Sequence, residues 1–166
     1  MLALWTQHTV FGGAGAEVRW YEINPATHSL IQHGTVSSTS LFTFDAAVSP
    51  DRRVNGTSTK FGGNMMINVV QSSAAVLPEI EVASKVGKGA ISALVPVATS
   101  AAPDTGFDCT TSGTSVCRWG DYAAATPDPS SPSTATTGVV WGSSMLAAAG
   151  STTTSGWTTE NFEVKT

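Results

Sequence analysis

The sequence is poor in charged residues, and this limits the partners that the chain can recognise. Asp, Glu, Lys and Arg make up 12% of its 166 residues, against about 25% in typical soluble domains. The formal net charge is −4, and the eight basic residues are scattered, with Arg52-Arg53 as the one adjacent pair. Binding to nucleic-acid phosphates requires clustered basic residues. A nucleic-acid partner is therefore not expected.

Long apolar segments are also missing. No apolar run approaches the roughly 20 residues that a membrane-spanning helix needs, so we expect no membrane span. The first residues, Met1 to Trp5, are accompanied by neither a basic region nor a long apolar segment, and they do not form a signal peptide pattern. If the protein is secreted, we expect its export signal to have been removed or to lie on a longer precursor.

The motifs of several enzyme classes are absent. The three histidines lack metal-ligand spacing, and no Gly-x-Ser-x-Gly elbow indicates a serine hydrolase. The glycine-rich residues 11–15 are not followed by the Lys-Ser/Thr of a phosphate-binding loop. Glu79 and Glu81 share a face of a predicted strand, which we interpret as a solvated edge rather than a catalytic pair. The sequence therefore identifies no catalytic residue and no metal site, and it favours a non-enzymatic function.

Cysteine is scarce: Cys109 and Cys117 are the only two. Neither a CxxC pair nor a nearby histidine supports a zinc site. The Thr, Ser and Gly residues between them can form a tight turn, so we predict a disulfide, with two buried free thiols as the alternative. In the chain-entropy model such a short loop stabilises the fold by about 2–3 kcal/mol, and it fixes the approach to Trp119. A disulfide implies an oxidising compartment, which favours an extracellular or cell-surface location.

The pattern that is present predicts an all-β protein. A chain of this length forms one domain, so residues 1–166 are expected to be a single all-β domain with approximate modules 1–107 and 108–166. Residues 16–23 alternate between two faces, a turn follows at Asn24-Pro25, and residues 30–36 return, which predicts a hairpin. No segment keeps the 3.6-residue periodicity of a helix, and residues 87–105 are expected to be extended or looping. The remaining predicted strands are 2–11, 41–48, 64–71, 79–84, 118–124, 138–148 and 157–164, with 41–48 paired to 64–71.

Tryptophans lie in several of these strands. Trp5 and Trp157 each open a strand, and we predict Trp20, Trp119, Trp141 and Trp157 to be buried structural anchors, one for each sheet. Repeated sheets that pack face to face are typical of β-propellers, whose blades take about 40–50 residues. The chain has room for roughly three or four blades, whereas closed rings have about 4–8. We therefore predict a partial β-propeller of antiparallel blades, with a β-sandwich as the alternative.

Residues 118–122 read Arg-Trp-Gly-Asp-Tyr and are followed by Asp128-Pro129, Val140-Trp141 and Trp157-Thr158. This order resembles the blade signature of secreted bacterial β-propellers of the sialidase-like group. Residues 18–25 and 44–48 are similar to preceding blades of those proteins, so the resemblance covers most of the chain, which would be part of a larger propeller. It implies a propeller fold and an extracellular location more than a particular activity.

The chain departs from that group in the residues that catalysis needs. No arginine cluster, no identifiable Tyr/Glu pair and no Ser-x-Asp-x-Gly-x-x-Trp box is present. Asp108, Asp121 and Asp128 are candidate oxygen ligands for a substrate or a calcium ion, while the structural interpretation of Asp121 is a turn residue that accepts backbone N–H bonds. No other cofactor is expected.

These observations lead to three hypotheses about function. The first is an extracellular propeller segment that serves as a binding or structural module, with carbohydrate or another protein as its partner. The second is a fragment of a sialidase-like glycan hydrolase whose catalytic residues lie partly outside this chain. The third is a self-assembling surface protein that associates through exposed blade edges.

Overall fold

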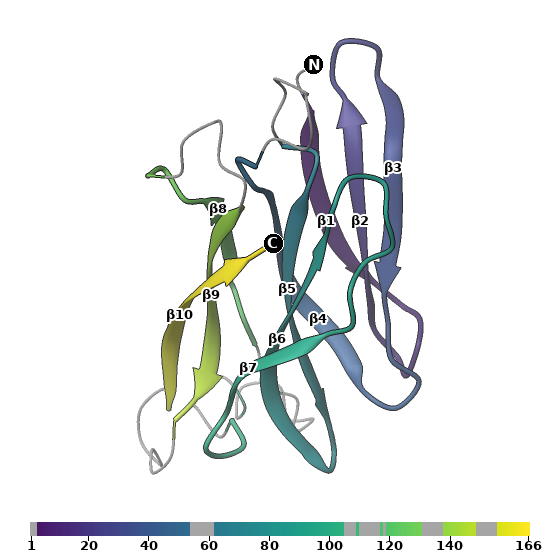
Figure 1. Cartoon of the computed structure of the whole chain (residues 1–166). Helices are drawn as coiled ribbons and strands as arrows, with labels where there is room; N and C mark the ends of the chain where they lie inside the picture. Colours follow the sequence, from purple (N-terminus) through teal and green to yellow (C-terminus); the bar gives the residue numbers. More distant parts are fainter. Residues whose placement is uncertain are drawn as a thin grey trace.

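A computed structural model confirms that the protein is all-β (Figure 1). It describes residues 3–53, 62–104, 109, 117, 119–130, 138–148 and 156–166. The described residues form ten strands in three antiparallel sheets, which we call the first, middle and third sheet in chain order. No helix long and apolar enough to cross a membrane occurs in this part of the chain.

The first sheet contains β1 (Leu4–Val10), β2 (Glu17–Asn24) and β3 (Ser29–Val36), in that order. The predicted hairpin is confirmed, because β2 and β3 pair antiparallel along their lengths. At the turn between them, the Asn24 side chain accepts a hydrogen bond from the Ala26 backbone N–H at 3.0 Å. An asparagine that bonds its own backbone two residues on is a common way to set such a turn.

The middle sheet contains four strands in chain order: β4 (Phe42–Pro50), β5 (Met65–Ser73), β6 (Val76–Lys85) and β7 (Val95–Thr99). The predicted pairing of the strand at 41–48 with that at 64–71 is confirmed by the β4–β5 register. Seven consecutive residues of β5 are buried, because sheets cover both of its faces. A strand buried on both sides has a near-continuous apolar sequence rather than an alternating one, and Asn68 and Gln71 are the two polar residues among the seven buried in β5.

The third sheet contains β8 (Ala124–Pro127), β9 (Val139–Ala147) and β10 (Trp157–Lys165), with β9 in the centre. The predicted strand at 118–124 is wrong, since the described residues before Ala124 are not in a strand. Gly120 has a φ of 57°, a left-handed conformation that an extended strand cannot contain. The strand instead ends at Pro127, and β8 is an edge strand in which a missing N–H is tolerated.

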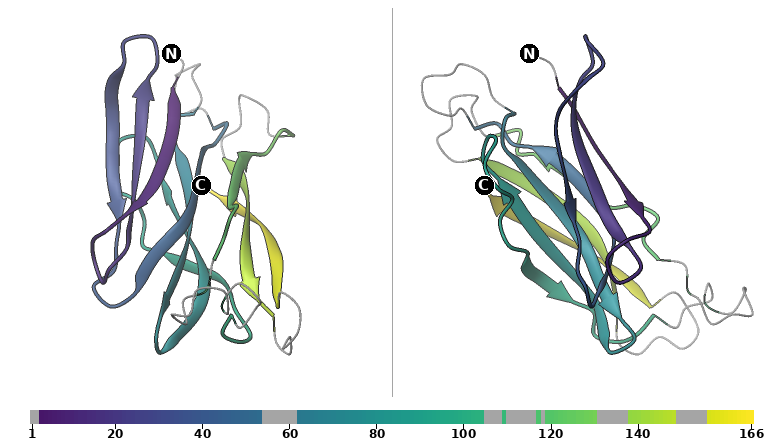
Figure 2. Two further views of the ribbon diagram at one scale, coloured as in Figure 1. Left: turned by 180° about the vertical axis from the view of Figure 1, so that it is seen from behind. Right: turned by 90° about the vertical axis from the view of Figure 1, so that its right-hand side faces the viewer.

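The three sheets stack face to face, with the middle sheet between the other two (Figure 1 and Figure 2). Two apolar cores fill the two interfaces, and each fully buried aliphatic side chain in them stabilises the fold by about 1.5–3 kcal/mol. The first core contains Val18, Trp20, Val36, Ala46, Met65, Ile67, Val69 and Ala83, and the second contains Met66, Val70, Ile80, Val82, Val140, Leu146 and Phe162.

The first strands of the three sheets are neighbours: β1 lies against β4, and β4 lies against β8. Blades of a propeller stack in this way around their inner strands. The described strands do not close into a ring. The arrangement is therefore consistent with part of a propeller and also with a layered sandwich.

Buried polar side chains also connect the sheets. Asp51, which is 1% exposed, accepts hydrogen bonds from Asn64 Nδ2 at 3.1 Å and from the hydroxyl of Thr166, at the end of the third sheet. Lys85 Nζ of the middle sheet donates to Gln32 Oε1 of the first sheet at 2.7 Å. Each contact satisfies a group that would otherwise be costly to bury.

Candidate functional site

A β-bulge in β4 is the point where the three sheets meet. The β4–β5 register is interrupted just before Ala47, and Asp45 has a φ of 46°, in the left-handed region. Side chains bond the backbone of the bulge: Gln7 Nε2 of β1 donates to Ala46 O at 2.5 Å, and Ala47 N donates to Asn68 Oδ1 of β5 at 3.2 Å. Bulges with a re-aimed side chain are frequent next to active sites.

Asn68 extends this junction to the third sheet. Its side chain is 0% exposed, and its Nδ2 donates to the Ser143 carbonyl of β9 at 3.4 Å. One amide therefore bonds the bulge of the middle sheet and the central strand of the third sheet at the same time. Since an unpaired buried polar group costs about 1–3 kcal/mol, this double contact fixes the position of β9 relative to the bulge.

The bulge directs the Asp45 carboxyl toward Gly120, in the segment that precedes β8. A Cβ atom at Gly120 would overlap the Asp45 carboxyl, and Gly120 also has a positive φ, so this position requires glycine on both counts. Asp45 Oδ2 is buried and has no hydrogen-bond partner among the described residues. Burial raises the pKa of Asp45 to about 6, and the nearby charge of Asp121 adds to the effect.

This arrangement can exchange a proton near neutral pH. A carboxyl with a pKa near neutrality beside a second carboxylate is a common feature of acid–base sites. Asp45 is also in a backbone conformation that is unusual for a residue with a side chain, and such strain gathers at functional positions. Asp45 was not selected from the sequence. The signal available there is an acidic residue in the interior of the apolar run Phe42–Val48.

The two predicted aspartate ligands that the structure describes, Asp121 and Asp128, have different surroundings. Asp121 lies near Asp45, whereas the Asp128 carboxylate accepts hydrogen bonds from the backbone N and hydroxyl of Ser130, both at 2.8 Å, in a turn. Asp108 lies outside the described residues. Calcium binding by this set stays a prediction.

One group of potential metal ligands does occur in the described part of the chain: Asp104 with Cys109 and Cys117. The two sulfurs form a disulfide with an S–S distance of 2.04 Å, which confirms the predicted pairing. Disulfide sulfurs are not thiolates, and thiolate is the form in which cysteine binds metals. This group is therefore a covalent link rather than a metal site. It lies two residues before Trp119, whose ring packs against the second core.

Trp20 is a buried anchor, as predicted. It is 2% exposed, its ring lies 6.0 Å from that of Trp5, and Lys85 Nζ lies 5.9 Å from its centroid. The ring therefore joins the first and middle sheets, combining apolar burial with a cation–π contact.

Trp141 and Trp157 are not buried, which corrects the prediction for both. They are 41% and 54% exposed. Side chains alternate along a strand, and in the third sheet Val140 and Phe162 face the second core. Trp141 follows Val140 and so faces away, and the β9–β10 register places Trp157 opposite Ala147, on the same outward side as Trp141. The alternation Val140-Trp141 was the sequence signal for this orientation.

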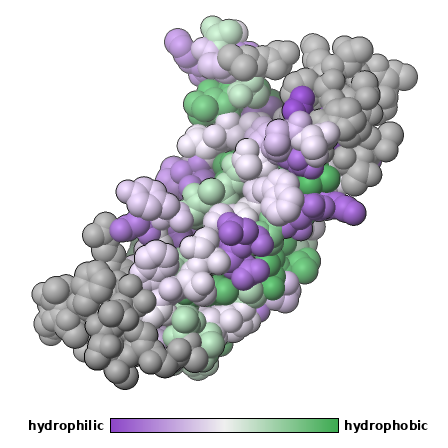
Figure 3. Space-filling model, turned by 90° about the vertical axis from the view of Figure 1, so that its left-hand side faces the viewer, coloured by the Kyte–Doolittle hydropathy of each residue, from purple (hydrophilic) through white to green (hydrophobic). Residues whose placement is uncertain are grey.

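The outward side of the third sheet, here called the aromatic face, combines these two indoles with polar side chains. Thr126 and Glu163 pair with Trp141 from the neighbouring strands, and Asn161 lies on the same side. Figure 3 views the molecule from the side on which the third sheet lies and shows polar and weakly apolar residues interspersed there. Aromatic residues with a polar surround are typical of interface surfaces.

Glu79 and Glu81 differ from the solvated edge that the sequence suggested. Both are half-buried, and Glu79 accepts a hydrogen bond from the Thr99 hydroxyl at 3.2 Å. Burial, with the charge of Glu79 as a second cause, raises the pKa of Glu81. Glu81 Oε2 has no hydrogen-bond partner among the described residues.

Comparisons with protein-family models, curated proteins and solved structures found no match.

Proposed function

We propose that this chain is an extracellular module of a propeller-like protein that acts in binding or assembly, and that the aromatic face is its contact surface. The observation that carries the proposal is the exposure of Trp141 and Trp157 on one side of a stack of sheets. The middle sheet has apolar cores on both of its faces, whereas the described residues form a core only on the inner face of the third sheet. A further sheet that packs on the aromatic face would extend the stack.

The energetics favour such a contact. A tryptophan buries about 150–250 Å² in an interface, so covering the exposed half of each indole is worth about 2–3 kcal/mol at 25 cal/mol per Å². Thr126, Asn161 and Glu163 supply donors and acceptors around Trp141, which suits the polar rim of an interface. The partner we propose is a second copy of the same sheet, because paired contacts between identical faces are the commonest oligomers.

The extracellular location is supported by the disulfide, since disulfides persist in oxidising compartments. The propeller assignment is supported by the stacking of the sheets and by the adjacency of β1, β4 and β8.

Light-scattering mass measurement during size-exclusion chromatography tests the proposal over a wide concentration range. We expect the wild type to dimerise as concentration rises and the double variant Trp141→Thr/Trp157→Thr to remain monomeric. Phe11→Thr is the matched control, because it removes an exposed aromatic side chain outside the third sheet. A wild type that stays monomeric throughout would refute the dimer. Retention of the wild type, but not of the double variant, on immobilised polysaccharide would assign the same face to carbohydrate.

A hydrolase is the second candidate, and the environment of Asp45 is the specific observation in its favour. Its raised pKa suits a general acid, and Asp121 offers the second carboxylate that glycoside cleavage requires. Turnover of a panel of sialosides and aryl glycosides, abolished in Asp45→Asn, would support this function. The absence of turnover across the panel would leave the binding function.

A further inference from the structure

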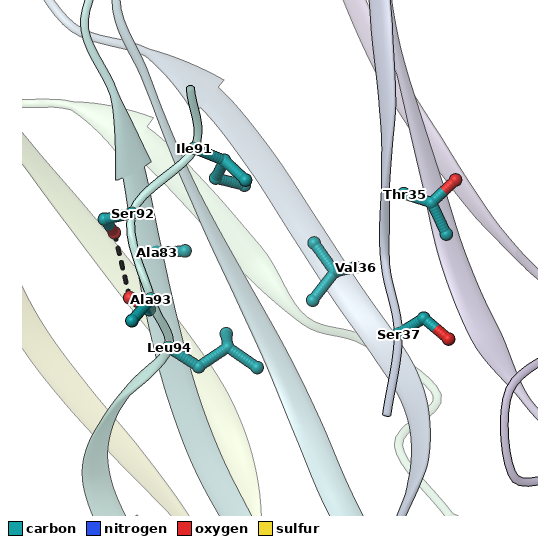
Figure 4. Close-up of a pocket in the computed structure, with 8 residues that line it drawn as sticks. All are labelled: Thr35, Val36, Ser37, Ala83, Ile91, Ser92, Ala93 and Leu94. Atoms are coloured by element: carbon teal, nitrogen blue, oxygen red, sulfur yellow. Dashed lines mark hydrogen bonds between the residues drawn. The ribbon is translucent and has the colours of Figure 1, made fainter. Parts of the chain in front are cut away.

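A pocket of about 230 Å³ opens between the first and middle sheets, beside β3. In Figure 4, the side chains of Val36 from β3 and of Ile91 and Leu94 from the segment before β7 point into the gap, while those of Thr35 and Ser37 point away. Because Thr35 and Ser37 nevertheless line the pocket, we infer that the main chain at the end of β3 forms part of this wall, together with the Val36 side chain.

Among the described residues, the β3 main chain has one edge without a partner strand, and this edge lies in the plane of the first sheet rather than on the face toward which Val36 points. β3 pairs with β2 on its other side and with no second strand among the described residues. The first sheet has three strands, whereas the middle sheet has a fourth, β7, beside β6. The segment before β7 continues this arrangement: Ser92 N donates to Ser84 O at 2.8 Å, and Ser84 N donates to Ser92 Oγ at 3.0 Å. The pocket lies between the end of β3 and this segment, at residues 91–94.

The pocket is also a gap in the first core. Val36 and Ala83 belong to that core, and Ile91 and Leu94 pack against it. None of the eight lining residues is charged. An occupant with aliphatic groups would therefore continue an interface that already exists between the two sheets.

We propose that this gap binds an extended peptide strand of another polypeptide, which pairs with β3 as a fourth strand and places aliphatic side chains in the pocket. In strand addition, the main-chain hydrogen bonds provide the affinity. Pockets that accept every second side chain of the added strand provide the specificity. The volume is below the roughly 300–1,000 Å³ of small-molecule sites, and it suits one or two aliphatic side chains. This site is separate from the aromatic face, and its existence does not depend on the proposed function.

Selection from a displayed library of short random peptides tests this inference. We expect the selected peptides to carry aliphatic residues at every second position and to bind Ala83→Leu, which fills the pocket, about tenfold or more weakly than the wild type. Ala124→Leu adds the same atoms at an exposed position of β8 and should bind as the wild type does. Ile91→Thr, on the surface segment, gives a second variant if Ala83→Leu does not fold.

Hydrogen exchange supplies the readout that distinguishes strand addition from apolar binding alone. Bound peptide should slow the exchange of β3 amides, and N-methylation of alternate peptide bonds should abolish both binding and protection. Failure to select binders, equal binding to Ala83→Leu, or unchanged β3 exchange would each overturn the proposal. Displacement of the peptide by excess unlabelled protein would assign the site to a second copy of this chain instead.

Discussion

Replacing Asp45 with asparagine tests whether the β4 bulge holds a carboxyl whose ionisation opposes folding. Asparagine has nearly the same shape, and it is among the few residues that tolerate a positive φ, so the backbone at 46° should persist. The substitution removes the charge that is buried against Gly120 and repelled by Asp121. We therefore expect Asp45→Asn to be more stable than the wild type at neutral and alkaline pH.

The magnitude follows from the pKa. The difference between the ordinary value of 3.8 and the value of about 6 corresponds to about 3 kcal/mol at most. The carboxyl is only partly buried, and solvent screening reduces this to about 1–2 kcal/mol, or about 2–8 °C in Tm for a protein of this size. Because the folded pKa is raised, Asp45 stabilises the fold below pH 3.8, and this contribution is lost as pH rises through about 6.

Urea unfolding followed by far-ultraviolet circular dichroism across pH 4 to 8 measures the effect. The free energy of unfolding of the wild type should fall relative to that of Asp45→Asn across this range, and the two should converge near pH 4. Asp128→Asn is the matched control for net charge, since asparagine retains the turn that Asp128 forms with Ser130. Equal pH profiles for the wild type and Asp45→Asn, or a less stable variant at pH 8, would refute the reasoning.

Two other perturbations test the junction, and a third tests the disulfide. Gly120→Ala should lower the free energy of unfolding by about 1–3 kcal/mol, because it adds a Cβ at a positive φ against Asp45; an unchanged urea midpoint would contradict this. Asn68→Ala leaves the Ala47 N–H of the bulge without its partner and should lower the free energy of unfolding by about 2–4 kcal/mol, measured by thermal unfolding. A near-neutral result would show that the bulge rearranges. Reduction of the disulfide should lower stability by about 2–3 kcal/mol, measured by unfolding with and without reductant, and no change would mean that the link does not constrain the unfolded chain.

Local sequence was sufficient to predict most strands because the alternation of side chains and the turn residues that bound a strand are local signals. The alternation of residues 16–23 and the turn at Asn24 specify the β2–β3 hairpin directly. The orientations of the tryptophans were harder to predict from the sequence. Trp20 and Trp141 have the same β-propensity, but Trp20 lies on a covered face of its sheet and Trp141 on an exposed one. A large aromatic ring predicts burial only when two things are known: which face of its strand the ring occupies, and whether another sheet covers that face.

The candidate site was not predictable in the same way. Asp45 and Gly120 are 75 positions apart, and their contact requires the third sheet to stack on the middle one. The left-handed φ of Asp45 likewise arises from the bulge, whose groups are bonded by Gln7 and Asn68 from other strands. No periodicity of one segment contains this information.

Local sequence signals are sufficient to predict the all-β fold class, the main hairpin and the disulfide, because strand alternation, turn chemistry and a short cysteine loop act over short distances along the chain. The packing of the sheets, by contrast, sets which of their faces are covered, which tryptophans stay exposed, and which acidic side chains meet. These properties depend on how sheets stack, and stacking is set by the combined apolar surface of strands that are remote in sequence.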